Sequence, residues 1–236
     1  MRAHGRGYPA RGMSAAAHPR ACTVAIVGGT GSGKTTLANA LAAALGDRCA
    51  VIDHDSYYRD LSHLLPADRA AVNFDHPDSL ENDLLALHLE RLRNGVPIDK
   101  PCYSFATHTR LPRTERIAPR PVVVVEGILL LAVSELQRSF DLRVFVDVDA
   151  DVRALRRLRR DVSERGRTVD GVFAQWLETV RPMHLRFVAP ARRQVDLVVS
   201  GEAPLADAVG AIVAALPARR TMPAFGADAA RPEAEA

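Results

Sequence analysis

Short apolar runs recur along the chain, and most are followed by a longer stretch with helical periodicity. The runs at 22–27, 49–55, 122–127, 142–148 and 195–200 are apolar and contain many β-branched residues. Such runs are typical of strands buried on both faces of a parallel sheet. Strands that alternate with helices predict an α/β fold with a parallel sheet and helices on both of its faces.

The helices are predicted from apolar residues spaced three or four positions apart. Leu37, Leu41 and Leu45 form one stripe after the first strand, and Gly46 is expected to end that helix. The other helices are expected at about 79–94, starting near Asp78 or Ser79 and stopping at Gly95; at about 150–163; at 168–188, kinked by Pro182; and at 203–216.

The remaining segments set the domain organisation. Residues 97–120 hold several prolines and short alternating runs, which predict a small β-rich flap inserted in the order of the sheet. Residues 21–216 are expected to form one domain. Residues 1–20 are rich in Arg, Gly and Ala, a bias that transit peptides share, but Gly and Pro disfavour the amphipathic helix of such a peptide. We expect 1–20 and 217–236 to be disordered, with Met13 as a candidate start.

Composition adds limits on the function. The net charge of +3 is too small to indicate nucleic-acid binding by itself, and we expect neither a nucleic-acid nor a membrane partner. The longest apolar stretch, 122–133, contains Glu126 and is too short to span a bilayer. The three cysteines, Cys22, Cys49 and Cys102, have no metal or redox spacing, which favours reduced thiols in the cytoplasm. Cys22 and Cys49 are expected to be buried in strands.

A phosphate-binding loop of the P-loop (Walker A) type lies between the first strand and the first helix. The pattern Gly28-x-x-x-x-Gly33-Lys34-Thr35 allows backbone N–H groups to turn toward phosphate oxygens, and the helix start adds donors and a positive dipole end. Lys34 and Lys100 are the only lysines in an arginine-rich chain, and a compact ammonium suits a phosphate loop better than a guanidinium. Residues expected to hold the nucleotide are Gly28, Gly29, Thr30, Gly31, Ser32, Gly33, Lys34, Thr35 and Thr36.

Acidic residues at two strand ends are expected to face this loop. Asp53 and Asp55 follow the second strand, and Glu126 ends the run 122–127. Ligands gather at the carboxyl ends of parallel strands, so Asp55 is a candidate general base for an acceptor hydroxyl. Thr35 and Glu126 are the expected Mg²⁺ ligands. The alternatives are a turn or cap role for the aspartates and a helix-start role for Glu126; Tyr57 and Tyr58 favour a ligand pocket.

A basic helix precedes the sequence SERGR. It has Arg153, Arg156, Arg157 and Arg160 on one face and Leu155, Leu158 and Val162 on another. A solvated face or a nucleic-acid patch are the ordinary alternatives. We predict instead an arginine-rich lid, about 153–170, which hinges at Gly166 and closes over a triphosphate.

Three motifs resemble the uridine kinase (uridine–cytidine kinase) family. They are NFDHPD (73–78), Y-x-F-x-x-H-x-R (103–110) and RRDVSERGR (159–167), within a match that runs in register from about 23 to 199. The resemblance implies an ATP:nucleoside 5′-phosphotransferase of pyrimidine salvage that makes UMP or CMP, with ATP (or GTP) and Mg²⁺, in a homo-oligomer that is usually a tetramer. It also implies the following roles: Asp55 as base; Lys34 and Arg160 in catalysis; Asp75 at the ribose diol; Tyr103 and His108 at the pyrimidine; Arg157, Arg167 and Gln175 at the nucleoside; and Arg160 and Arg165 at the phosphates.

Elementary chemistry agrees with two of these roles. A carboxylate such as Asp75 can accept from both hydroxyls of a cis-diol, which predicts a preference for ribonucleosides. A neutral His108 can face uracil or cytosine by changing tautomer. A cap before Pro77 and an ordinary surface histidine are the respective alternatives.

The chain departs from the uridine kinase pattern at one place, and two other functions remain as alternatives. The last strand is followed by SGEAP (200–204) where relatives have a Pro-Arg-Gly-Gly-like turn, which leaves the choice of ATP or GTP open. A phosphoribulokinase-like sugar-phosphate kinase would share the P-loop but needs a basic clamp for the acceptor's own phosphate. A non-enzymatic, nucleotide-dependent regulator would use the arginine helix instead.

Overall fold

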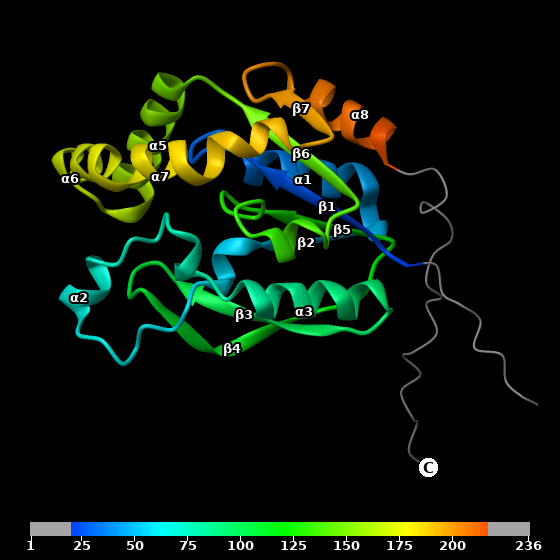
Figure 1. Ribbon diagram of the computed structural model, residues 1–236, viewed down its shortest axis with the longest axis horizontal. Helices are drawn as coiled ribbons and strands as arrows, with labels where there is room; N and C mark the ends of the chain where they lie inside the picture. Colours follow the sequence, from blue (N-terminus) through cyan, green and yellow to red (C-terminus); the bar gives the residue numbers. More distant parts are fainter. Residues whose placement is uncertain (1–19, 217–236) are drawn as a thin grey trace, which may run out of the picture.

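A five-stranded parallel sheet forms the centre of the protein (Figure 1). The computed structural model describes residues 20–216, so the predictions for 1–20 and 217–236 lie, apart from Arg20, outside the described residues. The strand order is β2-β5-β1-β6-β7. The strands are β1 (Cys22–Val27), β2 (Cys49–Asp53), β5 (Val122–Glu126), β6 (Leu142–Asp147) and β7 (Leu197–Ser200).

The central strands are apolar on both faces because helices cover both sides of the sheet. Successive residues of β1 and β5 point alternately to two separate cores, as the two-residue period of a strand requires. β2 lies at one edge, and Cys49 at its start is only half-buried, which corrects the expectation of a buried thiol.

Two helices pack on one face of the sheet and two on the other. Leu37 and Leu41 of α1 (Lys34–Leu45) share a core with Ile212 of α8 (Leu205–Ala215). The opposite core contains residues of α3 (Asn82–Arg93) and α4 (Ser134–Gln137). This arrangement confirms the α/β fold class predicted from the sequence.

The segment expected to form a flap is an antiparallel hairpin outside the main sheet. It consists of β3 (Ile98–Ser104) and β4 (Thr109–Ile117), with an irregularity in register between Pro101 and Tyr103. In Figure 1 the hairpin lies below α3, and the short α2 (Pro66–Ala70) lies to its left.

The lid region forms a separate group of helices at one end of the molecule (Figure 1). α5 (Ala150–Arg165) ends at Gly166, whose φ of 64° is the left-handed conformation that favours glycine. After it come α6 (Val169–Gln175), a π-helical turn (Trp176–Val180), α7 (Arg181–Met183), a second π-helical turn (His184–Val188) and a 3₁₀ turn (Ala189–Arg193).

One helix prediction needs correction, and the helix expected over 168–188 with a kink at Pro182 is found with distorted turns. The helix expected from Asp78 or Ser79 starts at Asn82, because Pro77–Ser79 forms a 3₁₀ turn and Leu80 bridges to Tyr58. The helix over 168–188 has widened turns on both sides of Pro182, which lacks an N–H and crowds the preceding turn. Of the described helices, none has the length and apolar character needed to cross a membrane.

Candidate active site

A cavity of about 140 Å³ opens at the carboxyl ends of β1, β2 and β5. Its walls come from four parts of the fold: the phosphate loop, the strand ends, the hairpin with the NFDHPD segment, and the lid. The lining residues are Thr30, Gly31, Lys34, Thr35, Asp55, Tyr58, Phe74, Asp75, Tyr103, Phe105, His108, Glu126, Ile128, Arg157, Arg160, Arg165, Arg167 and Gln175.

The phosphate loop joins β1 to α1. Gly31 and Gly33 have φ values of 80° and 88°, and a Cβ at Gly31 would lie 2.4 Å from the carbonyl oxygen of Arg153, so both conformation and space require glycine there. Lys34 begins α1, is buried, and donates to the carbonyl of Gly29 at 3.0 Å. Burial lowers the pKa of Lys34, while the nearby carboxylates of Glu126 and Asp55 oppose that shift.

Two carboxylates face this loop. Asp55 lies in the 3₁₀ turn His54–Tyr57 after β2, and Glu126 ends the adjacent strand β5. Burial, followed by repulsion from Glu126, raises the pKa of Asp55 to about 6, while the positive charge of Lys34 opposes the shift. An aspartate with a raised pKa beside a lysine in a cleft is typical of a proton acceptor in catalysis.

The oxygen atoms needed for Mg²⁺ are also present. The Thr35 hydroxyl donates to Glu126 at 2.7 Å, and both side chains line the cavity. No cluster of three or more potential metal-ligating side chains occurs among residues 20–216. Mg²⁺ usually takes one or two protein oxygens together with waters and substrate phosphates, and the Thr35 hydroxyl and the Glu126 carboxylate are oxygens of that kind.

Asp53 has a different position from the one expected. Its carboxylate accepts hydrogen bonds from the backbone N–H and the hydroxyl of Ser56 and pairs with Lys100 of β3. It is therefore a turn residue rather than part of the cavity wall. Lys100, buried and also paired with Glu115 at 3.2 Å, was not singled out as a site residue; it attaches the hairpin to the end of β2.

Aromatic rings line the side of the cavity opposite the phosphate loop. Tyr58 and Tyr103 have ring centroids 5.3 Å apart, and His108 stacks on Phe74 at 4.9 Å. The buried Tyr103 hydroxyl has no hydrogen-bond partner among the described residues. Tyr57, which was expected near a ligand, is instead fully buried and bonded to His88 at 2.9 Å.

Asp75 and His108 carry the polar groups of this side. Asp75 is 9% exposed, and burial raises its pKa against the opposing charges of Arg157 and Arg167. His108 has a positive φ of 53°, and burial together with Arg167 lowers its pKa, so the ring is neutral near pH 7. The Asx-like turn before Pro77 is made by Asn73, whose side chain accepts from the N–H of Asp75 at 3.1 Å.

The basic face of α5 divides between three environments. Arg157 and Arg160 line the cavity. Arg153 lies under the phosphate loop, where it donates to the carbonyl of Val148 at 3.1 Å. Arg156 donates to the carbonyl of Gly201 at 3.1 Å, beside a second cavity of about 290 Å³.

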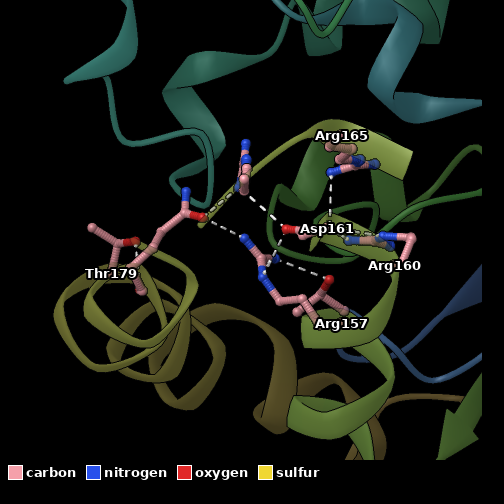
Figure 2. A network of polar contacts seen from close by, with 8 residues as sticks. Arg157, Arg160, Asp161, Arg165 and Thr179 are labelled. Atoms are coloured by element: carbon pink, nitrogen blue, oxygen red, sulfur yellow. Dashed lines mark hydrogen bonds and ion pairs between the residues drawn. The ribbon is translucent and has the colours of Figure 1, made fainter. Parts of the chain in front are cut away.

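On α5 the buried side chains include arginines, namely Arg153 and Arg157. The apolar face predicted at Leu155, Leu158 and Val162 includes exposed side chains. Leu155 is 66% exposed. In contrast Asp161, which sequence reasoning did not select, is fully buried among four arginines (Figure 2).

Comparison with known proteins is consistent with this geometry. The family model described as "Phosphoribulokinase / Uridine kinase family" matches residues 23–204. A uridine kinase of Chloroflexus aurantiacus is 52% identical over 196 residues, which cover 83% of this chain and 94% of that protein. A uridine kinase of Clostridium perfringens is 45% identical over 177 residues, which cover 75% of this chain and 85% of that protein.

Solved structures with low sequence identity share the fold. A phosphoribulokinase from Rhodobacter spheroides has a TM-score of 0.57 at 14% identity and covers 80% of this chain and 75% of its own. A D-glycerate 3-kinase from Cryptococcus neoformans has a TM-score of 0.55 at 16% identity. The match covers 78% of this chain and 87% of that one. The cavity, the P-loop and these matches define a P-loop kinase. The chain belongs to the phosphoribulokinase/uridine kinase family, which confirms the resemblance drawn from its motifs.

Proposed function

We propose that this protein transfers the γ-phosphoryl group of ATP to the 5′-hydroxyl of uridine and cytidine. The observation that carries the proposal is the composition of one cavity. Lys34 and Asp55 line the same cavity as Thr30 and Gly31 of the phosphate loop and as Asp75, Tyr103 and His108, which supports a shared site for donor and acceptor. The names of the most similar relatives support the choice of a pyrimidine nucleoside as acceptor.

The residues of the phosphate loop bind and orient the donor. Backbone N–H groups of residues 28–33 and the start of α1 hold the phosphate oxygens, and Lys34 balances their charge. Mg²⁺, held through Thr35 and Glu126 when bound, would neutralise charge on the β- and γ-phosphates. The second cavity, between Thr36 and Leu205, is the proposed place of the donor base.

That second cavity borders the SGEAP segment. It is lined by Gly201 and Ala203 of the SGEAP segment and by Arg156. A Cβ at Gly201 would lie 2.5 Å from the carbonyl oxygen of Ser32, so the segment packs closely against the phosphate loop. We keep ATP as the proposed donor and GTP as the alternative.

The acceptor is oriented by the opposite wall. We assign the ribose diol to Asp75 and the pyrimidine to Tyr103 and His108. With the nucleoside so placed, the 5′-hydroxyl points toward Asp55. The Asp55 carboxylate takes the hydroxyl proton as the new O–P bond forms to the γ-phosphorus and the bond from the γ-phosphorus to the β,γ-bridging oxygen breaks, which releases ADP. Arg157, Arg167 and Gln175 complete this side of the cavity.

The lid supplies charge and excludes water. Arg160 and Arg165 line the cavity on the side of Lys34 and Asp55, and each influences the protonation of one of these two groups. Guanidinium groups at that position stabilise the charge on the transferring phosphoryl group. Closure about Gly166 would keep water from replacing the nucleoside as acceptor.

A coupled assay of ADP release tests the proposal. Separate reactions contain uridine, cytidine, ribulose 5-phosphate or no acceptor, each with ATP and Mg²⁺. We expect release with uridine and cytidine and little with the other two. Release that depends on ribulose 5-phosphate would instead identify a sugar-phosphate kinase. The cytoplasmic location and the tetrameric assembly implied by the family resemblance stay predictions.

A further inference from the structure

The carboxylate of Asp161 forms ion pairs with four arginines of the described lid. Its Oδ1 atom lies 2.8 Å from Arg160 and 3.6 Å from Arg165. Its Oδ2 atom lies 3.2 Å from Arg167 and 3.5 Å from Arg157. Figure 2 shows the carboxylate at the centre of this group, with contacts to the guanidinium groups around it.

The helix and its end create this arrangement. Arg157 and Arg165 lie four residues before and after Asp161, on the same side of α5. Gly166 then turns the chain back, and the N–H groups of Gly166 and Arg167 both bond to the carbonyl of Asp161. The left-handed turn therefore returns Arg167 to the carboxylate of Asp161, the residue whose backbone carbonyl accepts the hydrogen bonds at the end of the helix.

The four arginines around Asp161 reach both parts of the cavity. Arg160 and Arg165 act electrostatically on Lys34 and Asp55 respectively. Arg165 also lies over the ring of Phe105 in the hairpin, with its Cζ atom 4.9 Å from the ring centroid.

Arg157 and Arg167, on Oδ2, act on Asp75, and both donate to the side-chain oxygen of Gln175, at 2.7 and 2.6 Å. Arg157 also donates to Thr30 of the phosphate loop at 3.1 Å. The arginines held by Asp161 thus contact both the phosphate loop and the hairpin, so one buried group connects the two halves of the site.

Positive charge dominates around Asp161. Guanidinium groups stay protonated in proteins, and the four arginines outnumber Asp161 and the carboxylates of Asp75 and Asp55 that also act on them. A triphosphate brings further negative charge that can bind Arg160 and Arg165 while Asp161 keeps Arg157 and Arg167 in place. Each substrate thus meets arginines that share the same anchor.

We propose that Asp161 is a positioning residue that couples the nucleoside side of the cavity to the triphosphate side; this inference rests on the proposed function. The first substrate to bind orders the shared carboxylate and its arginines, so the second substrate meets a cluster that is already ordered. The coupling is reciprocal, since each substrate must increase the affinity for the other by the same factor.

Calorimetric titration of uridine into the full-length protein tests the coupling. Titrations are made with and without a non-hydrolysable ATP analogue plus Mg²⁺. For the wild-type protein we expect the analogue to tighten uridine binding by about 5- to 150-fold, the usual range for coupled sites. Uridine binding that is independent of the analogue would overturn the coupling alone. Absence of uridine binding in both titrations would overturn the proposed function as well.

Two variants separate positioning from general disruption. D161N removes the charge at nearly constant size, and E164Q makes the same change at an exposed position of α5. We expect E164Q to behave as wild type. D161N should reduce the coupling to less than twofold and lower kcat at least tenfold, without weakening the binding of the analogue alone, because the arginines lose a competing anion. D161N with wild-type coupling, or with equally weakened binding of both ligands, contradicts the proposal. If D161N does not fold, the wild-type titrations decide the question.

Discussion

Asp53 and Asp55 are two positions apart in one turn, but only Asp55 faces the cavity. Asp53 is paired with Ser56 and Lys100, whereas the half-buried Asp55 lines the cavity near Lys34 and Glu126. The structure thus distinguishes a residue that holds the turn from the candidate base.

Replacement of Asp55 by asparagine tests its role as base. The amide keeps the size of the side chain but cannot take a proton, so we expect kcat to fall by about 10²- to 10⁴-fold. Binding of the ATP analogue, measured by calorimetry, should change little. D68N, at an exposed position of α2, is the control. A D55N protein with wild-type turnover would exclude Asp55 as the base.

Asp75 predicts a preference for ribose over deoxyribose. With 2′-deoxyuridine the buried carboxylate loses one hydrogen-bond donor, which costs about 1–3 kcal/mol, or roughly 5- to 150-fold in kcat/KM. D75N should lower kcat/KM with both uridine and 2′-deoxyuridine. The ratio of the two kcat/KM values should be smaller than in the wild-type protein. Equal kcat/KM values for uridine and 2′-deoxyuridine in the wild-type protein would contradict the assignment of Asp75 to the diol.

His54 predicts a loss of stability in mild acid. Its ring is buried against Asn82, and burial lowers its pKa to about 4. The unfolded chain therefore binds more protons than the folded chain between pH 4 and 6.5, so stability falls as the pH falls through this window. Between pH 7 and pH 5, the titration of His54 should lower the unfolding free energy by about 2 kcal/mol.

Urea unfolding of wild type and H54Q at pH 7 and pH 5 measures this effect. Glutamine has no titrating ring, so the difference in unfolding free energy between the two pH values should shrink by about 2 kcal/mol. An unchanged difference would show that His54 does not carry this acid sensitivity.

At the scale of elements, the sequence predicts those parts of the site whose reactive side chains and the backbone that positions them lie in one short segment. The phosphate loop and Asp55 follow directly from a strand and the turn after it. Asp161 was missed because its importance depends on four arginines, one of which returns to it only through the turn at Gly166. Lys100 was missed as a site residue because its partner Asp53 is 47 residues away.

The same distinction applies to secondary structure. The five strands of the sheet were predicted to within a few residues because burial on both faces leaves a clear apolar run. The start of α3 was predicted three or four residues early because the capping residues near Asp78 belong to a separate 3₁₀ turn. Pro182 predicts a distortion of the helix over 168–188, but not that the distortion takes the form of π-helical turns. The outward position of Leu155 depends on how α5 packs.

The attachment of the hairpin gives a prediction at this scale. Lys100 is buried between Asp53 and Glu115, so K100M leaves both carboxylates without that partner and should cost about 1–3 kcal/mol of unfolding free energy. R116M removes an exposed ion pair of 3.6 Å to Asp99 on the same hairpin and should cost less than about 1 kcal/mol. Urea unfolding compares the two variants. Equal small losses would show that Lys100 does not anchor the hairpin.

For the whole molecule, ligand binding should appear as thermal stabilisation. At a concentration of 100 times its Kd, the ATP analogue with Mg²⁺ stabilises the folded state by about 2.7 kcal/mol. For a domain of this size the expected rise in Tm is roughly 5–10 °C. K34M should abolish most of this rise, since Lys34 is central to the phosphate loop. A K34M protein with the full rise would place the triphosphate elsewhere.

The order of strands also determines when the central strand can find its partners during synthesis of the chain. β1 carries the phosphate loop at its end, but its two neighbours in the sheet, β5 and β6, begin at Val122 and Leu142. A nascent chain that has left the ribosome only as far as residue 121 contains the whole loop without either neighbour of the strand that supports it. Truncation products of that length should aggregate or be degraded rather than bind nucleotide, because their central strand exposes two unpaired edges.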